Sequence, residues 1–458
     1  MNRSQIILLL LCFLGSFQLL GGESFCFRVY LKDKGNSGYS IDHPEEFLSQ
    51  EAIERRLRQE KGVDVSDLPI AEAYLDALRE IGCEPVTQSK WLQTVVVATS
   101  DSLLSERLTD LSIVDSVKWI WKGEREHLTD NRHDTSVIEP QTEPIKAYYG
   151  YAEAQIKMLN GIKLHQKGYT GEGMRVAVID AGFKNVDRIS LFDSLRILGT
   201  RNIVFPGENV FFGDDHGTKV LSCMAINQPG MMVGTAPLAS YLLIKSEDIR
   251  SEYPVEEDYW AAAVEYADSA GVDVITSSLG YFRFDTEGLN YTYEDLNGQT
   301  AVSSRIASMA AEKGILLFSS AGNEGNGSWE KITVPSDVAD ILTVGSITSD
   351  KKRSGFSSMG PTADGRVKPD VVALGSSSCV VDATGDIRQA SGTSFATPIL
   401  AGLGVCLWQA CPELSNLELI ELIRHVSSQY RRPDIELGYG IPDMYKAYKL
   451  HRKNASRH

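Results

Sequence analysis

The chain has 458 residues, and its 45 Lys and Arg residues against 61 Asp and Glu residues give a formal net charge of −16. Hydrophobic residues make up 43% and charged residues 23% of the chain, which excludes a mainly disordered protein, a collagen and a coiled coil. The acidic balance argues against nucleic acid as the main partner, because phosphate binding needs a basic surface.

The first 24 residues have the pattern of a secretory signal peptide. Arg3 precedes an apolar run from Ile6 to Leu14, and small residues follow at Gly21 and Gly22. The apolar run is short for a bilayer span. We therefore expect a protein that is secreted or periplasmic, in the cell envelope, with no stable membrane span once the signal is removed. An N-terminal membrane anchor is the alternative.

Residues 25–122 predict a small α+β domain. Strand patterns cover 27–32, 91–98 and 114–122, and helical spacing covers 44–60, 69–81 and 102–111. The charged stretch from 124 to 144 contains proline and has no periodicity. We therefore expect an exposed linker over residues 123–148.

Residues 149–450 predict a larger α/β domain, followed by a tail at 451–458. Short apolar runs alternate with helical stretches, at 174–180, 241–246, 272–280, 314–323, 341–347 and 367–375. This alternation is typical of βαβ units, so the fold class is a parallel sheet flanked by helices. Ligand sites in such folds lie at the carboxyl ends of the strands.

Three chemically active side chains stand at such element ends. Asp180 ends the run VAVID, His216 in GDDHGTKV precedes an apolar helical stretch, and Ser394 in SGTSFATP begins another. A serine hydroxyl needs an adjacent base to act as a nucleophile. An imidazole can serve as that base, and a buried carboxylate can hold the imidazole in the right tautomer.

A fourth polar residue follows the run 314–323. Asn323 lies in SSAGNEG, and its amide could donate to a developing oxyanion together with the backbone N–H of Ser394. These four residues in this order predict acyl transfer by a serine nucleophile.

The motifs DAG, HGT, SAGN and GTSxATP, in this order, resemble those of the subtilisin-like serine proteases over about residues 150–450. The resemblance implies a serine endopeptidase with Asp180, His216 and Ser394 as its triad and Asn323 in its oxyanion hole. It also implies that Ser278, Leu279 and Gly280 bind the substrate backbone. Residues 27–122 resemble the family's propeptide, which assists folding and then occupies the cleft as an inhibitor. The protein is therefore expected to be a zymogen whose partners are a protein or peptide substrate and its own propeptide-like domain.

The sequence departs from the family pattern at three neighbouring positions. Ala181 stands where Ser or Thr is commoner, Lys219 where a second His is frequent, and Phe395 where Met is frequent. None of these changes removes a catalytic group, but the hydrogen bonding of Asp180 is expected to differ. Thr333, Val334 and Pro335 are candidates for the specificity pocket.

No cofactor or metal is expected to be required. The family's structural calcium remains possible, but no acidic loop for it is evident. Seven cysteines are too scattered for a disulfide scaffold or a zinc ribbon. Cys406 and Cys411 are close enough to pair, and two buried free thiols are equally compatible with the sequence.

Three other functions remain open. The fold could serve as a catalytically silent binding module, or the same triad could support an esterase. An oxidoreductase would need a dinucleotide loop at GEGMRV (171–176), which precedes its strand and lacks a third glycine.

Overall fold

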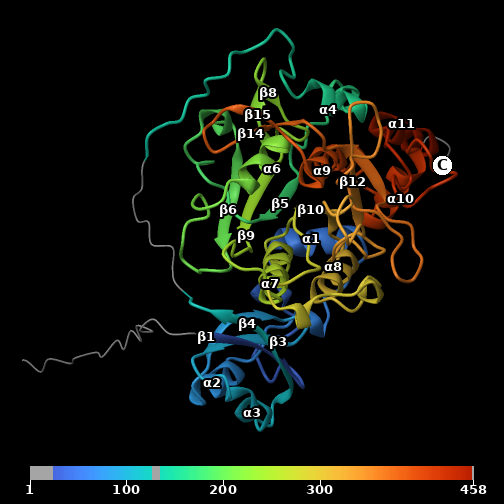
Figure 1. Cartoon of the computed structure of the whole chain (residues 1–458). Coiled ribbons are helices and arrows are strands. Elements are labelled where there is room, and N and C mark those ends of the chain that lie inside the picture. Colours follow the sequence, from blue (N-terminus) through green and yellow to red (C-terminus); the bar gives the residue numbers. More distant parts are fainter. Residues whose placement is uncertain (1–23, 126–134, 456–458) are drawn as a thin grey trace, which may run out of the picture.

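The computed structural model describes residues 24–125 and 135–455, so all of the expected signal peptide except Ser24 and part of the linker lie outside the described residues. Two main sheets, of four and seven strands, organise these residues (Figure 1). Residues 24–123 form a small antiparallel α+β domain, and the rest of the described chain forms a larger α/β domain.

The small domain is a four-stranded antiparallel sheet in the order β2-β3-β1-β4. Its elements in chain order are β1 (Ser24–Leu31), α1 (Gln50–Arg58), α2 (Glu72–Glu80), β2 (Glu84–Ser89), β3 (Thr94–Thr99), α3 (Leu104–Thr109) and β4 (Val114–Gly123). Alternation along β3 points Val95 and Val97 into the domain's own core. Val96 and Ala98 point the other way, into a hydrophobic cluster shared with the larger domain.

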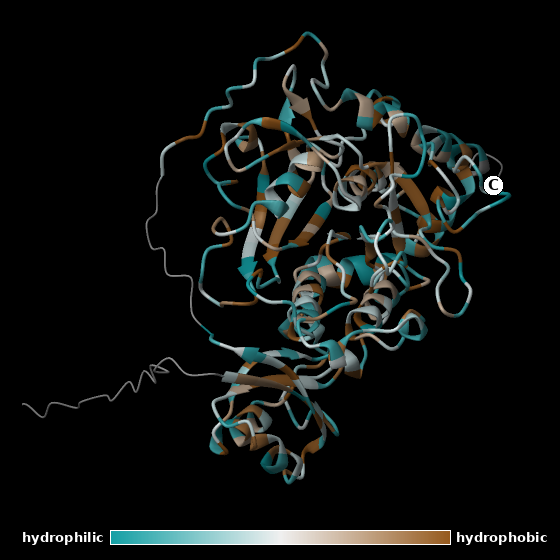
Figure 2. Cartoon of the chain, viewed as in Figure 1, coloured by the Kyte–Doolittle hydropathy of each residue, from teal (hydrophilic) through white to brown (hydrophobic). Residues whose placement is uncertain are grey.

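The larger domain is built on a seven-stranded sheet in the order β13-β12-β11-β10-β5-β9-β6, and all its strand pairs are parallel. The strands are β5 (Arg175–Asp180), β6 (Arg196–Asn202), β9 (Ser240–Lys245), β10 (Val274–Ser277), β11 (Leu316–Ser320), β12 (Leu342–Ile347) and β13 (Val371–Leu374). Figure 2 shows hydrophobic residues concentrated on the inner strands. The predicted parallel sheet is thus confirmed. Because β9 and β6 lie on one side of β5 and β10 to β13 on the other, a crevice is expected at the strands' carboxyl ends.

Helices cover both faces of the large sheet (Figure 1). On one face of the sheet, the larger hydrophobic core cluster includes residues of six helices. They are α4 (Glu153–Met158), α5 (Ile162–His165), α6 (His216–Ala225), α9 (Thr393–Ala410), α10 (Asn416–Val426) and α11 (Met444–Ala455). The other face carries α7 (Val255–Ser269) and α8 (Val302–Glu312). The two remaining strand pairs are short antiparallel ribbons, β7 (Asn227–Gln228) with β8 (Met232–Val233) and β14 (Ser378–Val381) with β15 (Ile387–Ala390).

Helix α9 runs through the centre of the core. It is the one helix of the described residues that is long and apolar enough to cross a membrane, and 94% of it is buried inside the protein. Two glycines allow neighbours to approach its backbone. A Cβ at Gly402 would lie 2.1 Å from Thr235 Oγ1, and one at Gly404 would lie 2.5 Å from the Phe318 ring. The helix is therefore fixed in place by close packing.

The small domain is held against α7 by buried charges. The Arg28 guanidinium contacts both carboxylate oxygens of Asp258, at 2.7 and 2.6 Å. Arg55 and Arg56 on α1 both bind Asp268. Glu265 accepts bonds from the turn between β2 and β3, including the N–H of Lys90 at 2.9 Å. Unpaired buried charge is costly, so these contacts specify how the two domains fit together.

The structure differs from the sequence-based expectations in several elements. The expected helix over 44–60 is divided, because a short 3-10 turn ends before Ser49 caps α1 by accepting the Ala52 N–H. Strands β2 and β6 were not predicted. Helix α11 runs on to Ala455, past the expected start of the tail at 451. Within the linker, Ile138 forms a parallel bridge with Ile189 of the larger domain.

Candidate active site

Asp180 and His216 are joined directly. Asp180 is the last residue of β5 and His216 the first of α6, and the His216 Nδ1 lies 2.7 Å from Asp180 Oδ1. The same carboxylate oxygen accepts the Ala181 N–H at 2.8 Å. Asp180 is fully buried, and its Oδ2 has no hydrogen-bond partner among the described residues. The alanine at 181 has no hydroxyl to offer this oxygen.

The environment of His216 favours its protonated form. Burial disfavours the imidazolium, but the charge and hydrogen bond of Asp180 outweigh it, with help from Asp214, so the pKa of His216 is raised above its usual 6.5. The backbone N–H of His216 donates to Asp214 Oδ1 at 2.7 Å, so this second carboxylate is held close to His216. Phe395 packs near the ring, with centroids 6.1 Å apart.

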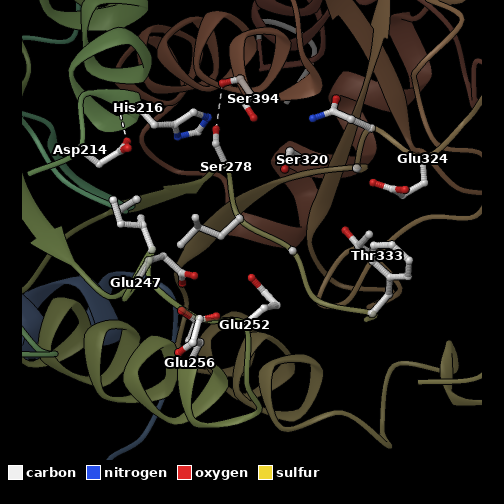
Figure 3. Close-up of a pocket in the computed structure, with 18 of the residues that line it drawn as sticks. Asp214, His216, Glu247, Glu252, Glu256, Ser278, Ser320, Glu324, Thr333 and Ser394 are labelled. Carbon is white, nitrogen blue, oxygen red and sulfur yellow. Dashed lines mark hydrogen bonds between the residues drawn. The ribbon is translucent and has the colours of Figure 1, made fainter. Parts of the chain in front are cut away.

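Ser394 is the second residue of α9 and lines the same cavity as His216 (Figure 3). No hydrogen bond joins the Ser394 hydroxyl to His216 in the part of the chain that the structure describes. Apo sites often tighten only when substrate binds. The backbone carbonyl of Ser394 accepts the Ser278 hydroxyl at 2.9 Å. Pro398, four residues further on, has no N–H to offer that carbonyl.

Asn323 lies beside the start of α9. Its Oδ1 accepts the Thr393 N–H at 2.9 Å and the Thr393 hydroxyl at 3.0 Å. With the oxygen held in this way, the Nδ2 group is left to donate elsewhere. The Ser394 N–H belongs to the first turn of a helix, where backbone donors lack helical partners. The Asn323 amide and the Ser394 N–H are therefore two donors available near the start of α9.

The cavity around these groups has a volume of about 640 Å³. Ser278, Leu279 and Gly280 continue from β10 and line it, and the backbone groups of Leu279 and Gly280 have no hydrogen-bond partner within the described residues. A Cβ at Gly280 would lie 2.1 Å from Thr333 Oγ1, so only glycine allows this approach. Thr333 lines the cavity, whereas Val334 pairs with the backbone of Tyr281 instead.

The small domain approaches the rim of the cavity without lining it. Trp121, near the end of β4, donates its indole N–H to the hydroxyl of Ser251, a lining residue, at 3.2 Å. Among the described residues, none of the small domain lines the cavity. Blockage of the cleft by this domain is therefore not seen in the described chain.

Two groups of residues were missed by the sequence analysis. Asp214 stands in the GDDHG motif two residues before His216, and three glutamates line the far side of the cavity, at Glu247, Glu252 and Glu256. Their signal was the acidic stretch SEDIRSEYPVEED, which follows β9 at the edge of the sheet where ligand sites are expected.

Other site chemistries gain no support within the described ranges. No group of three or more His, Cys, Asp or Glu residues is placed to hold a metal ion. The six described cysteines are buried free thiols, including Cys406 and Cys411. Burial raises the pKa of these two thiols, to about 12 for Cys411, so neither is poised as a nucleophile.

Two protein-family models match the chain. Residues 171–440 match the model of the subtilase family of S8 peptidases, and residues 26–136 match the S8 propeptide domain found in Bacteroidota. Subtilisin NAT of Bacillus subtilis subsp. natto is 29% identical over 299 residues, which cover 62% of this chain and 71% of that protein. Subtilisin of Bacillus pumilus is 29% identical over 295 residues, covering 64% and 97%. Subtilisin Savinase of Lederbergia lenta is 28% identical over 266 residues, covering 58% and 87%.

Proposed function

The chain belongs to the subtilase family and is a subtilisin-like serine endopeptidase with a propeptide domain, and from this premise we propose that Asp180, His216 and Ser394 form its catalytic triad. The observation that carries the proposal is the 2.7 Å bond between His216 and Asp180 at the rim that also holds Ser394. The bond uses the Nδ1 of the ring, so the Nε2 is available to a hydroxyl.

In the proposed mechanism, Ser394 attacks the carbonyl carbon of the scissile peptide while His216 takes the hydroxyl proton. His216 then gives this proton to the departing amine, leaving an acyl-enzyme that water hydrolyses by the same steps. Asp180 holds the ring and stabilises the imidazolium formed at each step. Its charge is buried, so this stabilisation is not lost to solvent screening.

Asn323 and the Ser394 N–H are proposed to hold the oxyanion. The support is the pair of bonds from Thr393, which fix the Asn323 oxygen and leave its Nδ2 as the remaining donor. Such donors stabilise charge that develops only in the transition state, so they act mainly on kcat.

The segment Ser278 to Gly280 is proposed to bind the substrate backbone as an added strand. The unpaired backbone groups of Leu279 and Gly280 support this role, because an extended peptide satisfies such groups when it joins a sheet edge.

We also propose that the protein is made as a zymogen and secreted or exported to the cell envelope. The small domain would fold against α7 and α8, and the enzyme would cut the chain within residues 123–148 after the signal peptide is removed. Parallel sheets with long crossovers fold slowly, since loop closure precedes the favourable contacts, so a domain that binds the native sheet could speed folding.

A fluorophosphonate probe tests the proposed nucleophile. The purified protein should be labelled, and Ser394→Ala should abolish both labelling and hydrolysis of a denatured protein. Ser391→Ala, which changes an exposed serine three residues away, should retain both. Absence of labelling in the unmodified protein would point to a silent binding module. Cleavage of a p-nitrophenyl ester without cleavage of protein would point to an esterase.

A further inference from the structure

One side of the cavity carries three acidic side chains that the proposed mechanism does not use. Glu247 follows β9, Glu252 lies in the next loop and Glu256 lies in the first turn of α7. Figure 3 shows the three side chains gathered across the cavity from His216 and Ser394. Glu324 and Thr333 lie at the other end, beyond the segment that follows β10.

The most buried of the three carboxyl groups has one oxygen without a donor. Glu256 is only 2% exposed, and its Oε2 has no hydrogen-bond partner among the described residues. Its Oε1 accepts the backbone N–H of Asp248 at 3.2 Å, and the carboxyl group of Glu252 also interacts with it. Glu247 is better satisfied, because it accepts the Tyr281 hydroxyl at 2.6 Å. Buried polar groups are usually paired, so the open Oε2 is a feature that needs an explanation.

No lysine or arginine of the described chain neutralises the three glutamates. None of its lysines or arginines forms an ion pair with Glu247, Glu252 or Glu256. The one arginine that lines the cavity, Arg250, binds Asp248 at 2.7 Å and lies 5.1 Å over the Phe205 ring.

The three acids therefore hold their protons more tightly than ordinary glutamates. Burial raises the pKa of Glu252 to about 7, and the nearby charge of Asp285 adds to this rise. Burial also raises the pKa values of Glu247 and Glu256 well above the usual value, and repulsion from neighbouring carboxylates raises them further. A positive charge placed among them would allow all three to ionise and would satisfy the open oxygen.

We propose that Glu247, Glu252 and Glu256 form a subsite for a lysine or arginine side chain of the substrate, lying before the scissile bond. The subsite borders the segment Ser278 to Gly280, where the proposed function places the substrate backbone, so this inference rests on that function. All three acids line the same cavity as this segment. A metal ion is the less suitable occupant, because no described group of acidic residues has the geometry to hold one.

The test compares lysine with norleucine, which has a similar length and no charge. Internally quenched peptides of neutral sequence would carry one or the other at each of the four residues before the scissile bond. The quantity measured is the ratio of kcat/KM for the lysine peptide to that for the norleucine peptide, which does not depend on the amount of active enzyme. At one position at least, the unmodified enzyme should favour lysine by about tenfold or more, as expected for a buried charge-assisted contact.

Variants then locate the source of the preference. Glu252→Gln and Glu256→Gln should each reduce the ratio at that position by about fivefold or more. Glu287→Gln removes the same charge from an exposed residue outside the cavity and should leave the ratio unchanged. Equal rates for lysine and norleucine at all four positions would overturn the proposal. So would a preference that survives in both glutamine variants.

Failure of the underlying function looks different. If neither peptide is cut and the fluorophosphonate probe does not react, the proposed protease activity fails and the subsite falls with it. If neutral peptides are cut without any preference for lysine, the triad stands and only the subsite is wrong.

Discussion

The hydroxyl of Ser278 donates a 2.9 Å hydrogen bond to the backbone carbonyl of Ser394. In an uninterrupted helix this carbonyl would accept the N–H of residue 398, which is a proline here. The proline thus removes one helical hydrogen bond from the first turn of α9, and the Ser278 hydroxyl, just after β10, replaces it. Through this contact the strand proposed to hold the substrate also fixes the backbone of the proposed nucleophile.

Removing this hydroxyl should weaken the folded state. Ser278→Ala leaves a buried carbonyl unsatisfied, which should lower the free energy of unfolding by about 1–3 kcal/mol. The measurement is urea unfolding in a Ser394→Ala background, which prevents self-digestion and keeps the carbonyl. Adding Pro398→Ala restores an N–H to the helix, so it should cost less in the Ser278→Ala protein than alone. Additive effects of the two changes would contradict the contact.

Asn323 should act on kcat through its amide nitrogen. Asn323→Ala should reduce kcat by roughly 10²- to 10³-fold with little change in KM, as for other oxyanion donors. The change also removes the oxygen that binds Thr393, so Asn323→Asp is the matched control. It keeps an acceptor for Thr393 and removes the donor, and steady-state kinetics should show a comparable loss. An aspartate variant with the parent kcat would mean that Asn323 only caps α9.

The pH profile should report the raised pKa of His216. The base must be neutral, so kcat/KM should rise with pH through a midpoint above the usual histidine value of about 6.5. Asp214→Asn removes a negative charge that favours the imidazolium, and the midpoint should move to lower pH. Lys219→Met removes a positive charge that disfavours it, and the midpoint should move to higher pH. Shifts in the same direction in both variants would rule out this electrostatic account.

The buried ion pair between Arg28 and Asp258 should contribute strongly to the unfolding free energy of the full chain. Arg28→Met leaves the Asp258 carboxylate buried without its partner, which should cost about 3–5 kcal/mol of unfolding free energy. Arg28→Met with Asp258→Asn should recover part of this loss, because the amide is neutral. Both are measured by denaturant unfolding of the full chain carrying Ser394→Ala.

A second pair in the same interface provides the comparison. Arg58 binds Asp273 at 2.8 Å but its side chain is 41% exposed. Arg58→Met should therefore cost at most about 1 kcal/mol. Equal losses for the Arg28 and Arg58 variants would show that burial does not set the strength of these pairs.

The strands that carry the site were predictable because the sheet is buried on both faces. Their apolar runs were nearly continuous and ended in the residues of interest, as VAVID does at Asp180. Strand β6 was missed because it lies at the sheet edge, and its residues RILGTRN are mostly exposed or half-exposed. Strand β2 begins with an exposed glutamate followed by proline, which is unusual in a strand interior.

The burial of charged side chains depends on tertiary contacts, so the sequence pattern did not reveal it. The run from 246 to 258 resembles a solvated acidic loop, and only the fold turns Glu256 into the protein. In the same way, FRVYLK gives no sign that Arg28 is buried, because its burial depends on a helix 230 residues later in the chain. Patterns along a strand reveal its alternation, whereas the partner that covers each face is set elsewhere.

Helix α9 links the packing of the core to the position of the proposed nucleophile. Its first turn holds the proposed nucleophile, and its remaining length fills the middle of the protein between Thr235 and Phe318. A change deep in that packing, such as a methyl group added at Gly404, would shift the whole helix and with it the hydroxyl of Ser394. Selection for a more heat-resistant interior would therefore act on turnover at the same time.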